Sequence, residues 1–256
     1  LNIKLFRPNM NYKKNFLKSV IFRIDFPIIL ELSTNPPVEF QKKIIDNFPL
    51  TEQKTITELS VHMNKTDTTH ESFKSFIWIF NNASKNRKVE ISQKHLTVEF
   101  KDYTLFAEFL EVVSKVYNSF LQSYNTPLIS RFGHRYTNNI TIKSGNTFDW
   151  SGFINKKLIY VIDEFLTEKE KLSKLISQVI YNIDDYKVFF NYGMHNSDYP
   201  SVIGRKEFVL DYDCVIDNIN ATDVLTYLNI FNLRVNTMFE YCIDDELRKL
   251  MEPLDN

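Results

Sequence analysis

Glycine is scarce in this sequence. The chain has 5 glycines among 256 residues, about 2%, where a typical protein has about 7%. All of them follow residue 130: Gly133, Gly145, Gly152, Gly193 and Gly204. A glycine-rich phosphate loop needs several glycines close together. The first half of the chain therefore excludes that kind of nucleotide site, and Gly133, which lies between two arginines, requires a specific reason.

Cysteine and long apolar runs are also scarce. Cys214 and Cys242 are too few for a disulfide framework, and both fall in apolar segments, so we expect buried, reduced thiols. Reduced thiols are typical of a cytoplasmic protein. Apolar runs such as 26–30 and 76–80 have five residues, far short of the ~20 that span a membrane. The sequence predicts a soluble, cytoplasmic protein with no membrane association.

Neither sign of charge dominates, because 31 Lys and Arg face 32 Asp and Glu for a net charge of −1. With 43% hydrophobic residues, this composition excludes a disordered chain, and it gives no support to nucleic-acid binding. Residues 1–128 carry 17 basic and 13 acidic side chains (+4), whereas residues 129–256 carry 14 and 19 (−5). This asymmetry is either ordinary scatter or a basic surface that binds an acidic partner or the second half.

The hydrophobic periodicity of the first half changes twice. Val20, Phe22, Ile24 and Phe26 alternate with polar residues, which is typical of a strand. Residues 103–124 instead repeat apolar side chains at helical spacing. The expected elements are strand 16–26, helix 40–48, strands 55–63, 73–82, 88–92 and 95–100, and helix 103–124. Four consecutive strands joined by short polar loops favour an antiparallel meander.

The second half repeats this order loosely. Its expected elements are strand 128–142, a short helix over 150–157 with Asp149 as N-cap, hairpin strands 172–183 and 186–195, strand 207–216, and a long helix over 222–251. The sequence therefore predicts an α+β fold with antiparallel sheet and two long amphipathic helices packed on one face. The halves 1–127 and 128–256 are interpreted as an internal duplication of a β-α-β(n)-α unit, packed as one globular unit.

Three stretches resemble a known family. They are FLKSVIFRIDFP (16–27) with FQKKIIDNFP (40–49), the central RFGHRYTNNI (131–140), and FVLDYDCV (208–215) followed by NTMFEYCIDDELRKLM (236–251). In this order they are similar to a sporadically distributed family of prokaryotic proteins of similar length. Its central motif is Arg-x-Gly-x-Arg-Tyr-x-Asn, and its last helix contains Phe-Glu-x-x-Ile-x-Asp-Glu-Leu. The resemblance implies a setting in mobile or antiviral-defence genes and assigns no catalytic residue.

The central motif contains the densest cluster of candidate binding residues. In a strand, Arg131, Gly133, Arg135 and Asn139 share one face, whereas Tyr136 lies on the other. Two arginines separated by a glycine form an open fork for phosphate or carboxylate. Alternatively, the arginines pair with acidic residues of the second half and Gly133 is a bulge.

Asp211 and Asp213 lie two residues apart and so share one face of their strand. Such a pair suits Mg²⁺, as in metal-dependent nucleases, but no convincing third acid and lysine accompany it. The alternative is that these aspartates face solvent or pair with Arg131 and Arg135. The candidate binding residues are therefore Arg131, Gly133, Arg135, Tyr136, Asn139, Asp211 and Asp213.

Histidines and aromatic residues give weaker signals. The five histidines lack metal-ligand spacing, and His195 has no nucleophile motif near it, so we interpret it as a loop residue. Phe76, Trp78 and Phe80, followed by Lys85, Arg87 and Lys88, fit a stacking platform for single-stranded RNA in outline. The same aromatic residues also fit a buried core strand, which is the interpretation we prefer.

These observations favour a non-catalytic binding or adaptor protein that has a protein partner or self-associates, in a prokaryotic defence or mobile-element operon. No catalytic residue, metal site or cofactor is predicted. Two alternatives remain open: a metal-dependent nuclease or nucleotide-binding enzyme that uses Asp211, Asp213, Arg131 and Arg135, and an RNA-binding module on the basic first half.

Overall fold

The computed structural model describes residues 11–63 and 68–254, apart from the side chains of residues 58–63, 68–74 and 165. Its central feature is one antiparallel nine-stranded sheet in the order β2-β3-β4-β5-β1-β6-β9-β8-β7. The strands are β1 (Leu17–Asp25), β2 (Leu50–Met63), β3 (Thr68–Asn81), β4 (Arg87–Ile91), β5 (His95–Phe100), β6 (Leu128–Ile142), β7 (Leu175–Ile183), β8 (Tyr186–Met194) and β9 (Lys206–Asn220). The predicted α+β class with antiparallel sheet is confirmed.

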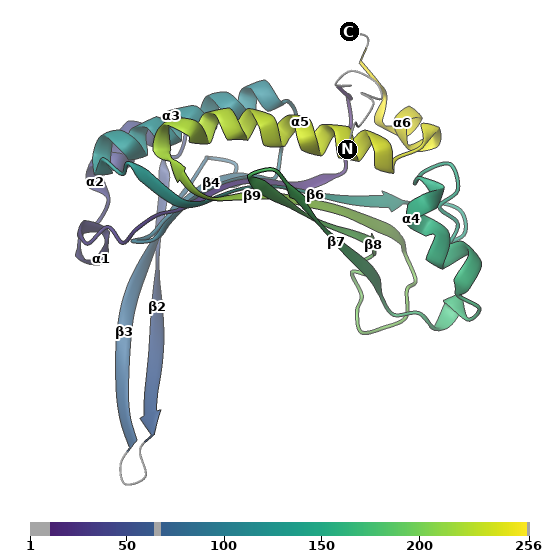
Figure 1. Cartoon of the computed structure of the whole chain (residues 1–256), viewed down its shortest axis with the longest axis horizontal. Helices are drawn as coiled ribbons and strands as arrows, with labels where there is room; N and C mark the ends of the chain where they lie inside the picture. The colour runs from purple at the N-terminus through teal and green to yellow at the C-terminus, as the bar shows by residue number, and fades with distance from the viewer. Residues whose placement is uncertain (1–10, 64–67, 255–256) are drawn as a thin grey trace.

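The helices connect the strands and cover one face of the sheet (Figure 1). They are α1 (Glu31–Thr34), α2 (Val38–Ile44), α3 (Phe106–Tyr124), α4 (Lys156–Tyr160), α5 (Val224–Cys242) and α6 (Asp245–Met251). Short π- and 3₁₀-helical segments lie at Val161–Phe165, Lys169–Lys171 and Ala221–Asp223. The two helices of 19 residues, α3 and α5, both run across this face of the sheet (Figure 1).

The core lies between these helices and the sheet because each central strand turns its apolar parity toward them. Phe22 of β1 packs its ring 5.9 Å from that of Tyr117 on α3, and Phe132 of β6 stacks 5.2 Å from Phe231 on α5. All four side chains are almost fully buried. Each such side chain contributes about 1.5–3 kcal/mol by leaving water. The strand alternation read from the sequence thus decides which face receives the helices.

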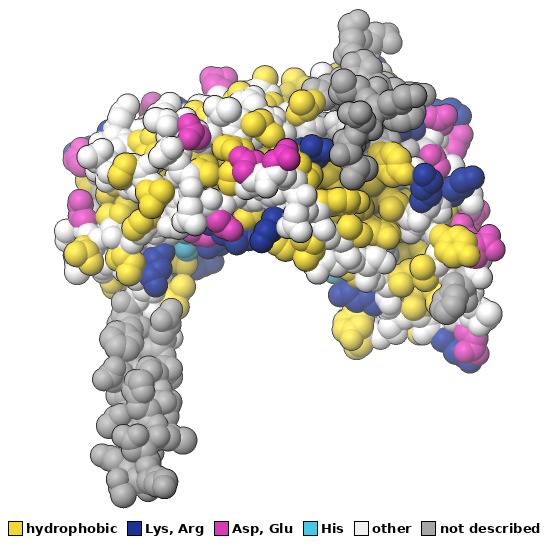
Figure 2. Space-filling view, in the orientation of Figure 1, with side chains coloured by type: hydrophobic (Ala, Val, Ile, Leu, Met, Phe, Trp, Pro, Cys, Tyr) yellow, Lys and Arg dark blue, Asp and Glu magenta, His cyan; other side chains and the backbone are white. Residues whose placement is uncertain are grey.

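The opposite face of the sheet is concave, and no helix of the described residues lies on it (Figure 1). The β2–β3 hairpin projects from one side of the arch, and β7, β8 and the α4 segment curve down at the other. Figure 2 shows the hollow between these projections, with acidic and basic side chains gathered along its wall.

Two helix predictions need correction. The expected helix over 222–251 ends at Cys242, because the following backbone is extended at Ile243 and pairs with residues 153–155. The expected helix over 150–157 begins only at Lys156. Gly152 has φ +79°, which interrupts helical geometry, and the side chain of Asn155, instead of Asp149, accepts the capping hydrogen bond from the backbone N–H of Lys157.

Cys214 and Cys242 are buried free thiols, as predicted. Burial raises the pKa of the Cys242 thiol to about 12. Within the residues that the structure describes, no helix is long and apolar enough to cross a membrane.

Candidate binding surface on the concave face of the sheet

The register of β1, β6 and β9 brings most of the predicted site residues to the concave face. Arg135 lies opposite Asp213, and Gly133 lies between Arg23 of β1 and Val215 of β9. The residues of the predicted set on this face are Arg131, Gly133, Arg135, Asn139, Asp211 and Asp213. Residues that are 78 positions apart in the sequence are thus direct neighbours across the sheet.

Arg135 and Asp211 form a two-pronged ion pair. Arginine Nε donates to Oδ1 at 2.8 Å and Nη2 donates to Oδ2 at 2.7 Å. Thr137 also donates to Oδ1, and Asn191 of β8 donates to Oδ2. Asp211 is only 9% exposed, so these four hydrogen bonds replace the water that its charge has lost. The interpretation that Arg135 pairs with an acid of the second half is correct for Asp211.

Arg131 and Arg23 also have aspartate partners. Arg131 lies 3.6 Å from Asp217 on β9, and Arg23 donates to Asp25 two residues along β1 at 2.9 Å. Asp217, Arg23 and Asp25 were missed by the sequence interpretation. Alternation on β1 predicts that Arg23 and Asp25 leave the core, but only the pairing of β1 with β6 reveals that they belong to this cluster.

Asp213 differs from these aspartates, because no lysine or arginine lies within ion-pair distance of it among the described residues. Burial raises the pKa of its carboxyl to about 6, and the nearby Arg135 opposes this only in part. The arginines around it hold their guanidinium groups toward Asp25, Asp211 and Asp217. Asp213 is therefore a desolvated acid with unused acceptor capacity in the middle of the surface.

Gly133 provides the space above Asp213. The strand register is continuous on both sides of Gly133, so the expectation of a bulge at this position is wrong. A β-carbon placed there would lie 3.7 Å from Oδ1 of Asp213, which is an ordinary contact. The backbone does not require glycine at this position. Because position 133 has no side chain, only its backbone lies beside the carboxyl of Asp213.

Tyr136 lies in the other layer, under the helices, as the alternation of β6 predicts. Its hydroxyl donates to Asn232 of α5 at 2.9 Å and lies 3.4 Å from the hydroxyl of Tyr103. Tyr136 and Tyr103 border a cavity of about 110 Å³ that Phe239 and Glu240 also line. Tyr136 therefore does not join the other predicted residues on the concave face.

The paired carboxylates do not present themselves as metal ligands. Both oxygens of Asp211 already accept hydrogen bonds from Arg135. Within the described part of the chain, no three His, Cys, Asp or Glu side chains gather as a metal site would require. His195 is exposed at the end of β8, and the side chains of His62 and His70 lie outside the described residues.

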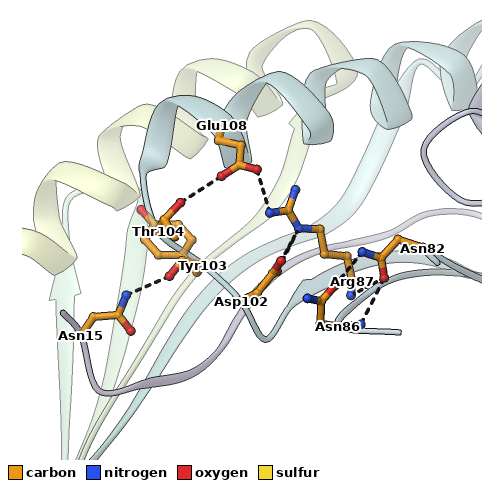
Figure 3. A network of polar contacts seen from close by, with 8 residues as sticks. All are labelled: Asn15, Asn82, Asn86, Arg87, Asp102, Tyr103, Thr104 and Glu108. Atoms are coloured by element: carbon orange, nitrogen blue, oxygen red, sulfur yellow. Dashed lines mark hydrogen bonds and ion pairs between the residues drawn. The ribbon is translucent and has the colours of Figure 1, made fainter. Parts of the chain in front are cut away.

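The basic residues that follow β3 are engaged in ion pairs. Figure 3 shows Arg87 between Asp102 and Glu108, which connects β4 with the first turn of α3. Lys88 pairs with Glu90 and Glu99, each at 2.9 Å. Phe80 is buried against Phe40 of α2, as expected of a core strand, whereas Phe76 and Trp78 are only partly buried. The side chain of Phe73 lies outside the described residues.

No known family model matches this chain, and no curated protein matches it either.

Proposed function

We propose that this protein is a non-catalytic binding protein whose concave sheet face holds a basic segment of a protein partner. The proposal rests on the environment of Asp213. This residue is a partly buried carboxylate in the middle of the concave face, its neighbour Gly133 has no side chain, and no lysine or arginine of the described residues forms an ion pair with it. A lysine or arginine from a partner would donate charge-assisted hydrogen bonds to the carboxylate of Asp213.

The pairing of the arginines supports binding of a cation more than binding of an anion. The donors of Arg135 are aimed at Asp211 at 2.7–2.8 Å, so a phosphate at the fork would have to break that pair. Breaking it would leave Asp211 buried without its counter-ion, at a cost of about 3–5 kcal/mol. The guanidinium group of Arg135 is thus already engaged within the protein, which counts against an anion site at the fork.

The balance of charge on this face supports a protein partner in the same way. The central strands present Arg23, Arg131 and Arg135 together with five acids: Asp25, Glu207, Asp211, Asp213 and Asp217. A nucleic acid would meet more negative than positive charge here, and phosphate contacts supply most of the affinity in such complexes. A basic peptide meets complementary charge.

The experiment is an NMR titration of the protein with a tetra-arginine peptide, and a tetra-glutamate peptide serves as the control ligand. We expect saturable shifts in the amides around Gly133 and Asp213 with the basic peptide alone. Asp213→Asn should weaken binding about tenfold, the loss of one charge-assisted contact. Asp46→Asn is the matched control, since Asp46 is exposed beyond α2, away from the concave face. Equal affinity of wild type and Asp213→Asn, or binding of tetra-glutamate, would overturn the proposal.

We also infer that the two halves are duplicates. The strand order reads β2-β3-β4-β5-β1 and then β6-β9-β8-β7, so each half places its first strand at the centre with its last strand beside it. In each half a helix of 19 residues follows the last strand. A comparison of relatives that fails to align 95–121 with 207–239 beyond chance would count against this inference.

The operon setting remains part of the proposal. If the basic partner is encoded beside this gene in a defence or mobile-element operon, its product should co-purify with wild type and not with Asp213→Asn. If wild type and Asp213→Asn both retained the product of the neighbouring gene, that product would bind at a site other than Asp213.

A further inference from the structure

The sheet ends at β7, and this edge has none of the features that normally protect an exposed strand. Its nine residues, LISQVIYNI, include no charged residue, no proline and no glycine. Natural edge strands are protected by charges, prolines or bulges, because their free backbone groups otherwise pair with another chain. The pairing of β7 with β8 is also regular over nine residue pairs. This edge is long, regular and uncharged.

The other edge of the sheet shows the contrast. Strand β2 places Glu52 and Lys54 on its exposed surface, which is the usual protection. In β7 the exposed positions carry no charge, and apart from Gln178 and Asn182 they are apolar. Ile176 is 38% exposed and Ile180 is 49% exposed on the concave side, and Tyr181 is 41% exposed on the helix side.

We propose that β7 pairs antiparallel with β7 of a second copy of this chain, about a two-fold axis that passes through Gln178. In this register Ile176 of each copy lies opposite Ile180 of the other. On the helix side, Leu175 lies opposite Tyr181 and Ser177 lies opposite Val179. Apolar cross-strand pairs of this kind each contribute about 0.2–1 kcal/mol, and the symmetry makes every unlike pair occur twice.

The choice of register follows from the pattern of the strand. The free N–H and C=O groups of β7 belong to every second residue, and an antiparallel partner must bond to those. The two-fold axis of two paired copies therefore passes through a residue position, not between two residues. An axis at Val179 would place Ile180 opposite Gln178 and Ile176 opposite Asn182. An axis at Ile180 would leave Ile176 opposite Asp184, beyond the partner strand. Only the axis at Gln178 matches both isoleucines with apolar residues.

The match of the two isoleucines favours a second copy over an unrelated strand. About Gln178, each β7 offers Ile176 and Ile180 to the other, so both strands carry the same complementary pattern. No charged residue lies within β7 to oppose the pairing.

The first experiment measures the molar mass of the full chain by sedimentation equilibrium over a range of concentrations. We expect a monomer–dimer equilibrium for wild type, and Ile180→Lys should raise the dimer dissociation constant by at least about tenfold, because it places two like charges near the axis. Ile56→Lys is the matched control. Ile56 is an isoleucine of similar exposure, 40%, on the opposite edge strand, and this variant should dimerise as wild type does. A monomer at every concentration, or a dimer equally insensitive to both substitutions, would overturn the proposal.

The second experiment tests the register and does not depend on a destabilising substitution. Gln178→Cys places two thiols opposite each other on the axis, within disulfide distance, and Cys214 and Cys242 are buried. Mild oxidation should cross-link Gln178→Cys and leave Asn182→Cys uncross-linked, because position 182 lies opposite position 174. Cross-linking of Asn182→Cys in preference to Gln178→Cys would overturn the two-fold axis at Gln178.

Discussion

Gly133 and Asp213 meet on the concave face of the sheet, where a β-carbon at position 133 would lie 3.7 Å from Oδ1 of the aspartate. They belong to β6 and β9, which lie next to each other in the sheet although β7 and β8 come between them in the chain. The absent side chain of one residue determines whether the carboxylate of the other can be reached.

Substitution of Gly133 should separate folding from binding. Gly133→Ala should stabilise the protein by about 0.5–1 kcal/mol, because the extended backbone accepts alanine and the unfolded chain loses freedom. Gly133→Leu should cover Asp213, raise its pKa further and abolish binding of the tetra-arginine peptide. Chemical denaturation and NMR titration of the Asp213 carboxyl measure these effects. Undiminished peptide binding by Gly133→Leu would show that the space above Asp213 is not used.

Asp213→Asn should stabilise the protein in a pH-dependent way. The pKa of Asp213 is raised from 3.8 to about 6, so between these values the folded state keeps a proton that the unfolded state has lost. Wild-type stability attributable to this group therefore falls as pH rises through that window. The gain from asparagine should be absent below pH 3.8 and reach about 1–3 kcal/mol above pH 6. Denaturation of both proteins across this range measures the difference, and a constant difference would contradict the raised pKa.

His134 should have the opposite pH dependence. It is fully buried beside Phe109, and burial lowers its pKa from 6.5 to about 4, although the hydrogen bond to the carbonyl of Ile21 opposes the shift. Between pH 6.5 and 4 the imidazole binds a proton in the unfolded state but not in the folded state. The free energy of unfolding therefore falls as pH falls, by up to about 3 kcal/mol. His134→Gln should remove this slope, whatever its stability at pH 8. The comparison requires denaturation curves for both proteins at several pH values, and equal slopes would argue against a neutral buried imidazole.

The pair formed by Arg135 and Asp211 should show strong coupling. Arg135→Ala leaves the buried carboxylate of Asp211 without its counter-ion and should cost about 3–5 kcal/mol. Asp211→Asn should cost less, because Arg135 is 47% exposed and can turn to water. Exchange of the two residues, Arg135→Asp with Asp211→Arg, should recover part of the loss. Urea denaturation of the single and double variants gives the coupling energy, and additive losses would mean that the pair is not a structural unit.

Much of the architecture could be read from periodicity. Alternation in strands β1, β6 and β9 separated Phe132 and Tyr136 from Arg131 and Arg135, and the structure places these side chains in opposite layers. The end of α5 could not be read in this way. The sequence continues in a helical pattern to Met251, but pairing of Ile243 with Ile154 competes for the same backbone groups and stops the helix at Cys242. Local pattern says nothing about a competitor that lies 89 residues away in the chain.

The ion pairs within the candidate site could not be predicted from the sequence, for a related reason. The arginines and aspartates were visible, but three arginines and four nearby aspartates allow many pairings, and the observed ones depend on strand register. Asp217 pairs with Arg131, which lies opposite it, whereas Arg135 lies opposite Asp213 but bonds Asp211, two residues along β9.

By itself, the sequence determined the α+β class, the parity of each central strand and the reduced state of its two cysteines, because these follow from local periodicity and composition. Only the tertiary structure decided that the sheet bends into an arch with one bare concave face, that Asp213 remains unpaired at its centre, and that β7 forms an uncharged edge. Those features depend on strand order and register, which are set by contacts between segments distant in the chain.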